Sequence, residues 1–217
     1  MLSTVIDFFL HLDLHLAAGL QNYGLWLYLI LFLVIFAETG LVVTPFLPGD
    51  SLLFAAGALC AMPESPLNVY YLGLTLIVAA IFGDATNFHI GQRFGSKVYQ
   101  WQKSFFFNPA HIKTTEAFFA KYGSWAIVFA RFAPIARTFA PFVAGVVRMN
   151  YRTFFRFNVL GGIVWIVVFL GAGAVFGNIP EVKKNFHVVI FAVIGLSVLP
   201  LFIGAIKSRM NRHVKTS

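Results

Sequence analysis

Long apolar segments, separated by short polar stretches, dominate the chain. A helix that spans a bilayer needs roughly 20 mainly apolar residues. Four segments meet this length and predict full membrane spans: Leu25–Thr44, Val69–Gly91, Phe157–Gly177 and Phe186–Ile206. Residues 1–24 are apolar but carry Asp7, His11 and His15 at helical spacing, which favours an interfacial helix over a metal site because no further ligand cluster accompanies them.

Two further apolar segments, 38–61 and 124–147, are interrupted by proline and glycine. After the first interruption, Leu52–Ala61 is too short to cross a bilayer. Non-helical backbone survives at membrane depth only where it is buried in protein or lines a wet cavity. We therefore predict two re-entrant hairpins. The residues expected to shape them and their packing are Pro45, Pro48, Gly49, Pro134, Pro141, Gly145, Asn87, Asn158 and Trp165.

Composition agrees with a membrane protein. Hydrophobic residues make up 59% of the 217 residues and charged residues 11%, whereas soluble domains carry about 25% charged residues. We predict a single all-α polytopic membrane domain, 1–217, with about four full spans. The net charge of +8 is concentrated near segment ends, which indicates membrane topology rather than nucleic-acid binding. One cysteine excludes an intrachain disulfide.

The distribution of basic residues predicts orientation. Residues 93–121 form a basic amphipathic segment, and residues 207–217 form a basic tail. Cytoplasmic loops carry an excess of Lys and Arg, so we expect both segments, and both termini, in the cytoplasm. The two hairpins then enter the membrane from opposite sides. We expect a basic turn between the second hairpin and the span Phe157–Gly177, formed by Arg148, Arg152 and Arg156.

Three carboxylates lie in or against apolar segments: Glu38, Asp50 and Asp84. An acid at the centre of a membrane helix costs roughly 2.5–3.5 kcal/mol, so each is a functional-site hypothesis. We interpret all three as proton-coupling or gating groups. Asp84 has an equally supported alternative, a near-interface acid satisfied by a neighbour on its own helix: Asn87, His89 or Arg93.

Two arginines, Arg131 and Arg137, lie in the second interrupted segment. Arginine inside an apolar segment usually faces the protein interior and is paired. Its guanidinium group binds phosphate through two parallel hydrogen bonds and stays charged. We predict that both bind a substrate phosphate and pair with Glu38 and Asp50 when the site is empty. The alternative is that one of them extends to the interface.

The two interrupted segments resemble each other. Thr44-Pro-Phe-Leu-Pro with Phe54-Ala-Ala-Gly57 is similar to Thr138-Phe-Ala-Pro with Phe142-Val-Ala-Gly145. Paired interrupted segments in corresponding halves are typical of transporters built from inverted repeats, with a site near the midplane. The Gly91-x-x-x-Gly95 spacing also predicts close helix packing.

Four motifs together resemble the DedA family of bacterial inner-membrane proteins, which belongs to the SNARE-associated or VTT domain superfamily. They are E-T-G…P-F-L-P-G-D-S at 38–51, G-D-x-x-N-x-x-x-G-x-x-x-G at 83–95, F-A-R-F-x-P-x-x-R-T-x-x-P-x-x-A-G at 129–145 and F-x-x-x-N-x-x-G-x-x-x-W at 154–165. The resemblance implies an inverted repeat with two opposed re-entrant hairpins. It also implies that Glu38, Asp50, Arg131 and Arg137 occupy the positions that the family needs.

The family resemblance further implies a role in moving lipids across the bilayer. Undecaprenyl phosphate is recycled by some bacterial members, and eukaryotic relatives scramble phospholipids. Members are also tied to envelope integrity, cell division and proton-motive-force homeostasis. We therefore expect an inner-membrane transporter of undecaprenyl phosphate or phospholipid, proton-coupled or passive.

A proton or cation antiporter is the alternative, since it would use the same intramembrane acids. An enzyme is not expected, because the chain has neither G-x-S-x-G nor H-E-x-x-H, and we assign no catalytic residue. We expect no cofactor and no bound metal. The expected partners are a lipid-phosphate substrate, membrane lipids and protons, without nucleic acid; a homo-oligomer is left open.

Overall fold

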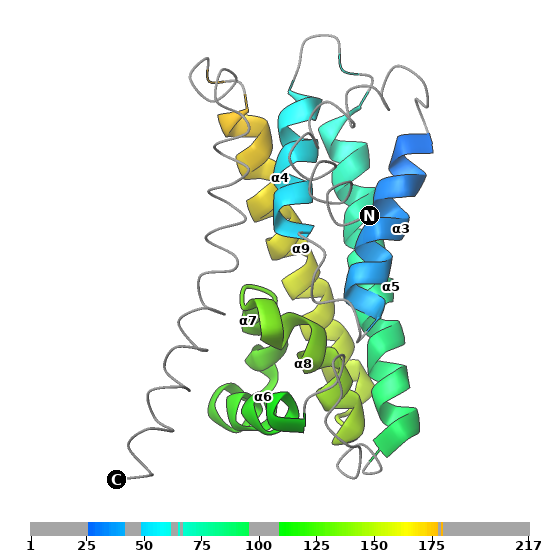
Figure 1. The fold of residues 1–217 in the computed structure, drawn as a ribbon, viewed down its shortest axis with the longest axis vertical. Helices are drawn as coiled ribbons and strands as arrows, with labels where there is room; N and C mark the ends of the chain where they lie inside the picture. Colours follow the sequence, from blue (N-terminus) through cyan, green and yellow to red (C-terminus); the bar gives the residue numbers. More distant parts are fainter. Residues whose placement is uncertain are drawn as a thin grey trace, which may run out of the picture.

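The computed structural model describes residues 26–41, 49–61, 65, 67–95, 109–177 and 179. Within these ranges all regular structure is helical, as predicted, and no strand occurs (Figure 1). The interfacial helix predicted in residues 1–24, the span Phe186–Ile206, the tail 207–217 and the prolines Pro45 and Pro48 lie outside the described residues.

Two long helices, α5 (Val69–Phe94) and α9 (Tyr151–Phe176), run the length of the molecule (Figure 1). Each has 26 residues, or about 39 Å at 1.5 Å per residue, enough to cross a hydrocarbon core of about 30 Å. Each begins at an asparagine cap, because the side chains of Asn68 and Asn150 accept hydrogen bonds from two backbone N–H groups of the first turn. Two of the four predicted spans, Val69–Gly91 and Phe157–Gly177, are confirmed as helices of spanning length. Within the predicted span Leu25–Thr44, the described residues form a shorter helix of 15 residues, Trp26–Gly40.

The start of α9 corrects one expectation. The helix begins at Tyr151, so Arg152 and Arg156 belong to its first two turns rather than to a basic turn before it. Only Arg148 lies in the turn, where its φ is 54°. An asparagine cap at Asn150 starts the helix earlier than the apolar pattern indicates, since the first turns are exposed and tolerate arginine.

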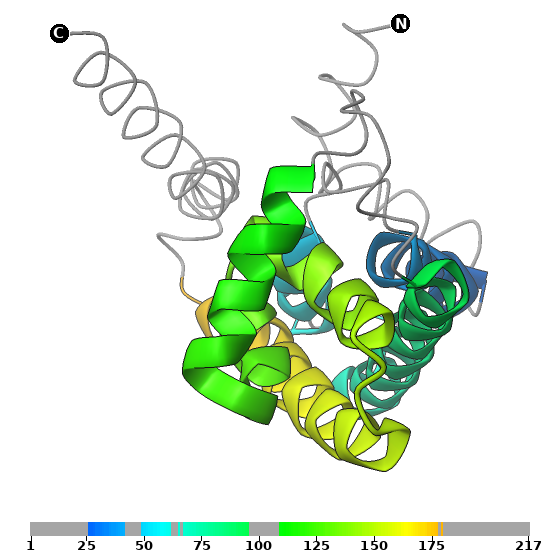
Figure 2. The same ribbon diagram turned by 90° about the horizontal axis from the view of Figure 1, so that it is seen from below.

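The helices α3 (Trp26–Gly40), α4 (Gly49–Cys60) and α8 (Pro134–Val146) are shorter. At 12 residues, α4 is about 18 Å long, roughly half of a bilayer core. Before α8, the chain forms the 3₁₀ turn η2 (Gly123–Trp125) and the five-residue helix α7 (Ala126–Ala130). The helix α6 (Pro109–Tyr122) lies across the lower end of the molecule and packs on α8 (Figure 2).

Proline acts differently at its two positions in the second interrupted segment. Pro134 is the first residue of α8, and Ala133 before it is extended, because a residue that precedes proline avoids the helical region. The chain therefore breaks between α7 and α8, as predicted. Pro141 lies inside α8, so the prediction that it also interrupts the segment is wrong.

Two of the short helices pack on the long helix of the other half of the chain, α4 on α9 and α8 on α5, whereas α3 packs on α5 of its own half. Four glycines face a backbone carbonyl across these contacts too closely for a methyl group to fit. They are Gly57 against Leu170, Gly173 against Phe54, Gly145 against Phe88, and Gly91 against Phe142. The Phe-x-x-Gly repeat therefore makes equivalent contacts in both halves, α4 in the upper part of the molecule and α8 in the lower part (Figure 1).

The Gly91-x-x-x-Gly95 prediction is correct for one glycine only. Gly91 makes the close contact with α8, but a side chain at Gly95 would meet no atom within 4 Å. Gly95 instead caps the C-terminus of α5 with a φ of 53°, a conformation that favours glycine.

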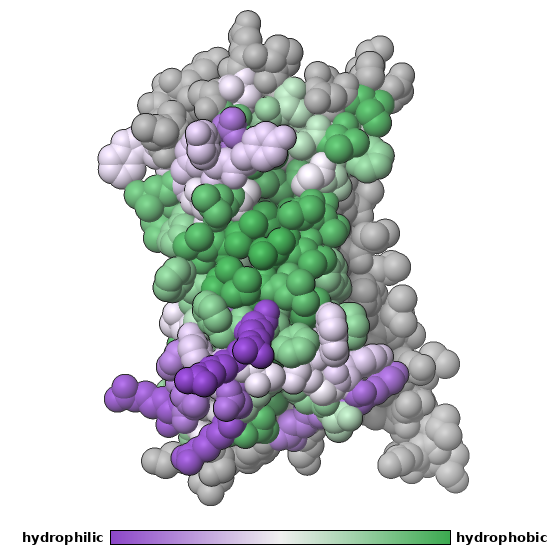
Figure 3. Space-filling view, turned by 180° about the vertical axis from the view of Figure 1, so that it is seen from behind, coloured by the Kyte–Doolittle hydropathy of each residue, from purple (hydrophilic) through white to green (hydrophobic). Residues whose placement is uncertain are grey.

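The outer surface of the long helices is apolar. Leu74 on α5 and Val167 on α9 are 62% and 60% exposed. Figure 3 shows a hydrophobic band on one face of the molecule, with hydrophilic residues below it. Such a continuous exposed apolar surface is typical of contact with lipid.

Candidate functional site

One buried arginine is held by two carboxylates. Arg137 Nη1 donates to Asp50 Oδ1 at 2.6 Å, and Arg137 Nη2 donates to Glu38 Oε1. Asp50 Oδ1 also accepts a hydrogen bond from Trp165 Nε1 at 2.9 Å. We call Arg137, Glu38, Asp50 and Trp165 the Arg137 cluster.

The ends of three short helices carry the charged groups of this cluster, and Trp165 comes from the middle of α9. Glu38 is near the C-terminus of α3, Asp50 is in the first turn of α4, and Arg137 is in the first turn of α8. Gly49 lies against the Glu38 carboxylate, where a methyl group would overlap the carboxylate oxygens. A glycine is thus needed at position 49 for the carboxylate to lie beside the start of α4.

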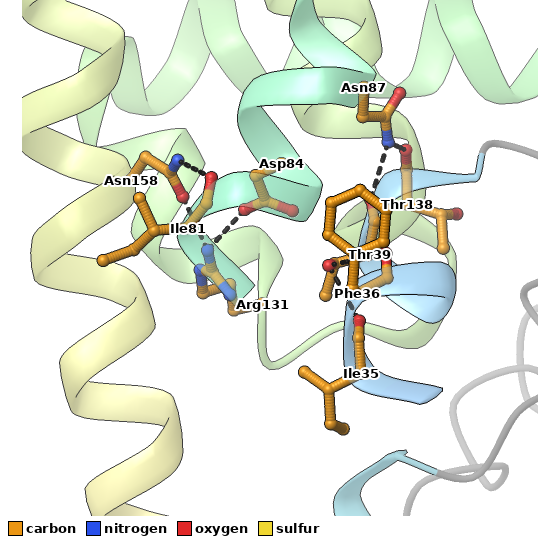
Figure 4. Close-up of polar contacts among 9 residues, drawn as sticks. All are labelled: Ile35, Phe36, Thr39, Ile81, Asp84, Asn87, Arg131, Thr138 and Asn158. Atoms are coloured by element: carbon orange, nitrogen blue, oxygen red, sulfur yellow. Dashed lines mark hydrogen bonds and ion pairs between the residues drawn. The ribbon is translucent and has the colours of Figure 1, made fainter. Parts of the chain in front are cut away.

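A second buried arginine contacts one carboxylate and one amide (Figure 4). Arg131 Nη2 donates to Asp84 Oδ2 and, at 2.6 Å, to Asn158 Oδ1. The Asn158 amide nitrogen donates in turn to the Ile81 carbonyl at 3.0 Å, which sets the orientation of the amide. We call Arg131, Asp84 and Asn158 the Arg131 cluster.

Glycines of α9 make room for Arg131. A side chain at Gly161 would come within 3.1 Å of Arg131 Cδ and Nε, and one at Gly162 within 3.6 Å of Arg131 Nη2. The chain leaves the helical path at Ala133, two residues after Arg131, and the glycine pair of α9 leaves room for the Arg131 side chain.

Burial decides two alternatives that the sequence leaves open. Asp84 is 2% exposed and pairs with Arg131, so its interpretation as a near-interface acid satisfied by Asn87, His89 or Arg93 is wrong. Arg131 and Arg137 are 2% and 8% exposed, so neither extends to the interface. The predicted pairing is half correct: Glu38 and Asp50 both pair with Arg137, and Arg131 pairs with Asp84 instead.

Trp165 joins the two clusters. Its ring centroid lies 4.9 Å from Arg137 Cζ and 5.8 Å from Arg131 Cζ, within the range of cation–π contacts. The joined clusters contain two guanidinium groups and three carboxylates. The Arg131 cluster contains one guanidinium group and one carboxylate, so its charges balance. The formal excess of one negative charge therefore lies in the Arg137 cluster, which contains one guanidinium group and two carboxylates.

Access to solvent also differs between the clusters. The side chains of Asp50 and Arg137 are 13% and 9% exposed, whereas those of Asp84 and Arg131 are 2% exposed each. A small ion or headgroup would therefore reach Asp50 and Arg137 first.

Asn87 on α5 forms hydrogen bonds to the two neighbouring helices α3 and α8 (Figure 4). Its amide nitrogen donates to the Thr39 carbonyl at 3.1 Å and to the Thr138 carbonyl at 2.9 Å. The Thr39 carbonyl is near the end of α3, where backbone acceptors lack a helical partner. Asn87 thus links α3, α5 and α8, a packing role that agrees with its assignment from sequence.

Several buried polar atoms of the clusters have no hydrogen-bond partner among the described residues: Arg131 Nε and Nη1, Arg137 Nε, and Asp84 Oδ1. Unsatisfied buried donors on an arginine are costly in a packed interior, and they are available to a ligand with several acceptor oxygens. No group of three or more metal-ligating side chains suited to a metal ion occurs in the described part of the chain.

The structure thus brings together five predicted charged residues and assigns contacts to most of the packing residues. Sequence reasoning placed Trp165 among the packing residues and missed its hydrogen bond to Asp50 and its position between the arginines. It also missed the roles of Thr39 and Thr138 as acceptors for Asn87, which no sequence signal indicates because backbone carbonyls are involved.

Comparison with known proteins identifies relatives along almost the whole chain. The VTT domain family matches residues 47–175. Protein DedA of Escherichia coli strain K12 is 48% identical over 205 residues, 94% of each chain. An uncharacterized membrane protein of Mycobacterium tuberculosis strain H37Rv is 41% identical over 80% of this chain and 76% of its own length.

An uncharacterized membrane protein of Mycobacterium leprae is 38% identical over 79% of this chain and 76% of its own length. No solved structure shows significant similarity to the chain. The match to the VTT domain and the extensive identity with DedA agree with the motifs and with the apolar, all-helical fold. The chain is a membrane protein that belongs to the DedA family.

Proposed function

We propose that the protein is a lipid transporter of the bacterial inner membrane that moves undecaprenyl phosphate or a phospholipid across the bilayer. The observation that carries this proposal is the pair of buried arginines whose remaining donors, Arg131 Nε and Nη1 and Arg137 Nε, lack partners in the described structure. A phosphate headgroup offers several acceptor oxygens, and guanidinium groups bind it through paired hydrogen bonds.

The surrounding helix ends favour an anion at the same place. Asp50 in the first turn of α4 contacts Arg137 in the first turn of α8, so the N-termini of the two helices converge. Helix N-termini carry a partial positive charge and free N–H groups, and they bind phosphate in many proteins. The phosphate would displace a carboxylate from Arg137 and take its place.

Proton coupling follows from the charge balance. The Arg137 cluster has two carboxylates for one guanidinium group, and Glu38 is 1% exposed. An uncompensated buried carboxylate is too costly to persist, so Glu38, the more deeply buried of the two, holds a proton when a phosphate occupies Arg137. Asp84 is balanced by Arg131 and is assigned to positioning rather than to proton coupling, in contrast to our interpretation of the sequence.

The proposed topology rests on the helix contacts and on the distribution of basic residues. The segments 38–61 and 124–147 form opposed re-entrant hairpins, and their two short helices make equivalent contacts on opposite long helices. Both termini and α6 are on the cytoplasmic side, because the basic residues of this chain gather there. The protein is proposed to act without catalysis and without nucleic acid.

Lipid movement in proteoliposomes tests this function. Purified full-length protein is reconstituted with fluorescent undecaprenyl phosphate or a fluorescent phospholipid, with and without a pH gradient. We compare wild type with Arg137→Lys and Glu38→Gln, and use Arg156→Lys, an exposed arginine of α9, as the matched control. Lysine is a point charge that cannot bind phosphate bidentately, so Arg137→Lys is expected to abolish transport.

The outcomes separate the alternatives. Gradient-dependent movement that both cluster variants lose supports a coupled carrier. Movement of both lipids regardless of gradient, retained in Glu38→Gln, would overturn coupling and leave a scramblase. If folded protein moves no lipid but dissipates a pH gradient through Glu38, the antiporter becomes the better assignment; the negative excess at Arg137 is the observation in its favour.

A further inference from the structure

A groove lies on the surface of the molecule, and none of its lining residues belongs to either cluster. It has a volume of about 680 Å³ and lies between the C-terminal half of α5 and the first turns of α9. Its walls include Phe82 on α5 and Tyr151 and Phe155 on α9, which are 60%, 41% and 41% exposed. The groove therefore opens on the outer surface of two helices of spanning length.

The groove changes in chemistry along its length. Its inner part is lined by Ile81, Phe82, Ala85 and Phe155, and its outer end by Arg93. Ile81 and Arg93 are twelve residues apart on α5, or about 18 Å along the helix axis. One leaflet of the hydrocarbon core is about 15 Å thick, so the groove is about as long as one leaflet is thick.

The outer end carries polar and cationic groups. The Arg93 side chain is exposed, and beside it are His89 and the Tyr151 ring, whose centroids are 5.2 Å apart. His89 Nδ1 is 2.6 Å from the Ala85 carbonyl, which accepts its hydrogen, so the α5 backbone holds the ring in place. None of the described residues that line the groove is acidic.

The groove is separate from the Arg131 cluster, although α5 contributes to both. Asp84 and Phe88 are buried on the inner face of α5, whereas Phe82 and His89 are exposed on the outer face. The hydrogen bond from Asn158 to the Ile81 carbonyl joins α9 to α5 between the groove and the Arg131 cluster. A molecule in the groove would thus touch the lipid-facing surface and not the buried arginines.

We propose that this groove binds one anionic phospholipid of the surrounding leaflet, with an acyl chain along Ile81, Phe82 and Phe155 and the phosphate at Arg93. A groove one leaflet long with an apolar inner part fits an acyl chain together with its headgroup, and the exposed arginine at the outer end attracts an anionic headgroup. The exposed Arg152, in the first turn of α9, adds positive charge at the same end of the molecule. The site does not depend on the proposed transport.

Native mass spectrometry of the full chain tests the site. Delipidated protein in detergent is titrated with phosphatidylglycerol and with phosphatidylcholine of the same acyl chains. Arg93→Gln is compared with Arg156→Gln, which removes the same charge from an exposed arginine outside the groove. Ala85→Leu, which fills the groove, is compared with Val167→Phe, which adds bulk to the exposed surface of α9 elsewhere.

Wild type is expected to retain one phosphatidylglycerol in preference to phosphatidylcholine. Arg93→Gln should weaken phosphatidylglycerol binding about five-fold, the contribution of one basic residue near a membrane surface, and remove the preference. Ala85→Leu should weaken the binding of both lipids, with circular dichroism showing intact helices.

Equal losses in Arg93→Gln and Arg156→Gln would overturn the proposal, because the preference would then come from net charge. Unchanged binding in Ala85→Leu would exclude the groove as the acyl-chain site. Disulfide-linked dimers formed by Phe82→Cys or Phe155→Cys would show that a second copy of the chain, and not a lipid, occupies the groove.

Discussion

Arg137 contacts two carboxylates and is 8% exposed, whereas Arg131 contacts one carboxylate and one amide and is 2% exposed. The two residues are close in sequence, and their guanidinium groups share the ring of Trp165. The Arg131 cluster is balanced in charge and closed, and the Arg137 cluster has a negative excess and partial access to solvent. Similar residues in one buried region are thus arranged for different tasks.

Buried ion pairs are weak evidence for stability, because the cost of desolvation offsets much of their attraction. Removing one partner is nevertheless expensive, since the other charge stays buried. This asymmetry separates the two clusters. Arg131 has a single counter-charge to lose, whereas Arg137 keeps one carboxylate when the other is neutralised.

The largest expected effect is that of Asp84→Asn. The substitution leaves the Arg131 charge without a counter-charge and should lower the free energy of unfolding by about 3–5 kcal/mol. Glu38→Gln is the matched variant in the Arg137 cluster and should cost about 1 kcal/mol or less, because Asp50 still pairs with Arg137. SDS-induced unfolding in mixed micelles, followed by circular dichroism, measures both.

Equal costs for these two variants would remove the distinction between a balanced and an unbalanced cluster. A larger cost for Glu38→Gln than for Asp84→Asn would reverse it. Glu116→Gln, on the partly exposed helix α6, gives the background for loss of a carboxylate elsewhere.

The next largest effect is expected from Gly173→Ala. The added methyl group would overlap the Phe54 carbonyl and push α4 away from α9, at a cost of about 1–3 kcal/mol. Because α4 carries Asp50, transport should fall, while the Arg131 cluster stays in place. Gly171→Ala is the control on the same helix, since a side chain there meets no atom within 4 Å.

Thermal unfolding and the lipid-movement assay measure the two consequences of Gly173→Ala. Gly171→Ala should be neutral or stabilise the helix, because alanine is favoured over glycine by about 1 kcal/mol in a helix interior. Similar behaviour of the two variants would argue against the close contact of α4 with α9.

The smallest effect is expected from Trp165→Phe. Phenylalanine keeps an aromatic ring between the two arginines but loses the hydrogen bond to Asp50, which should cost about 1 kcal/mol. The change should lower the rate of transport, because Asp50 loses one of the donors that hold its carboxylate in place. Trp125→Phe, a half-exposed tryptophan outside the clusters, is the control. An unchanged transport rate would show that Trp165 only packs.

Local patterns in the sequence were sufficient for much of the fold. The apolar lengths of α5 and α9, the break at Pro134 and the intramembrane acids and arginines follow from rules that act over a few residues. Pro141 does not interrupt the segment as the local pattern predicts, because packing of α8 on α5 outweighs the local preference of proline. The apolar pattern places the start of α9 too late, because Arg152 and Arg156 are tolerated in its exposed first two turns.

The amino-acid sequence thus determined which residues must be buried in the membrane and which of them carry charge. Their partners depended on contacts between residues far apart in the chain: 47 positions separate Arg131 from Asp84, and 115 separate Trp165 from Asp50. Neither arginine is distinguished from the other by its neighbours in sequence. Only the packing of α4 on α9 and of α8 on α5 decided that Arg137 receives two carboxylates and Arg131 one, because glycine contacts between distant helices set which charges meet.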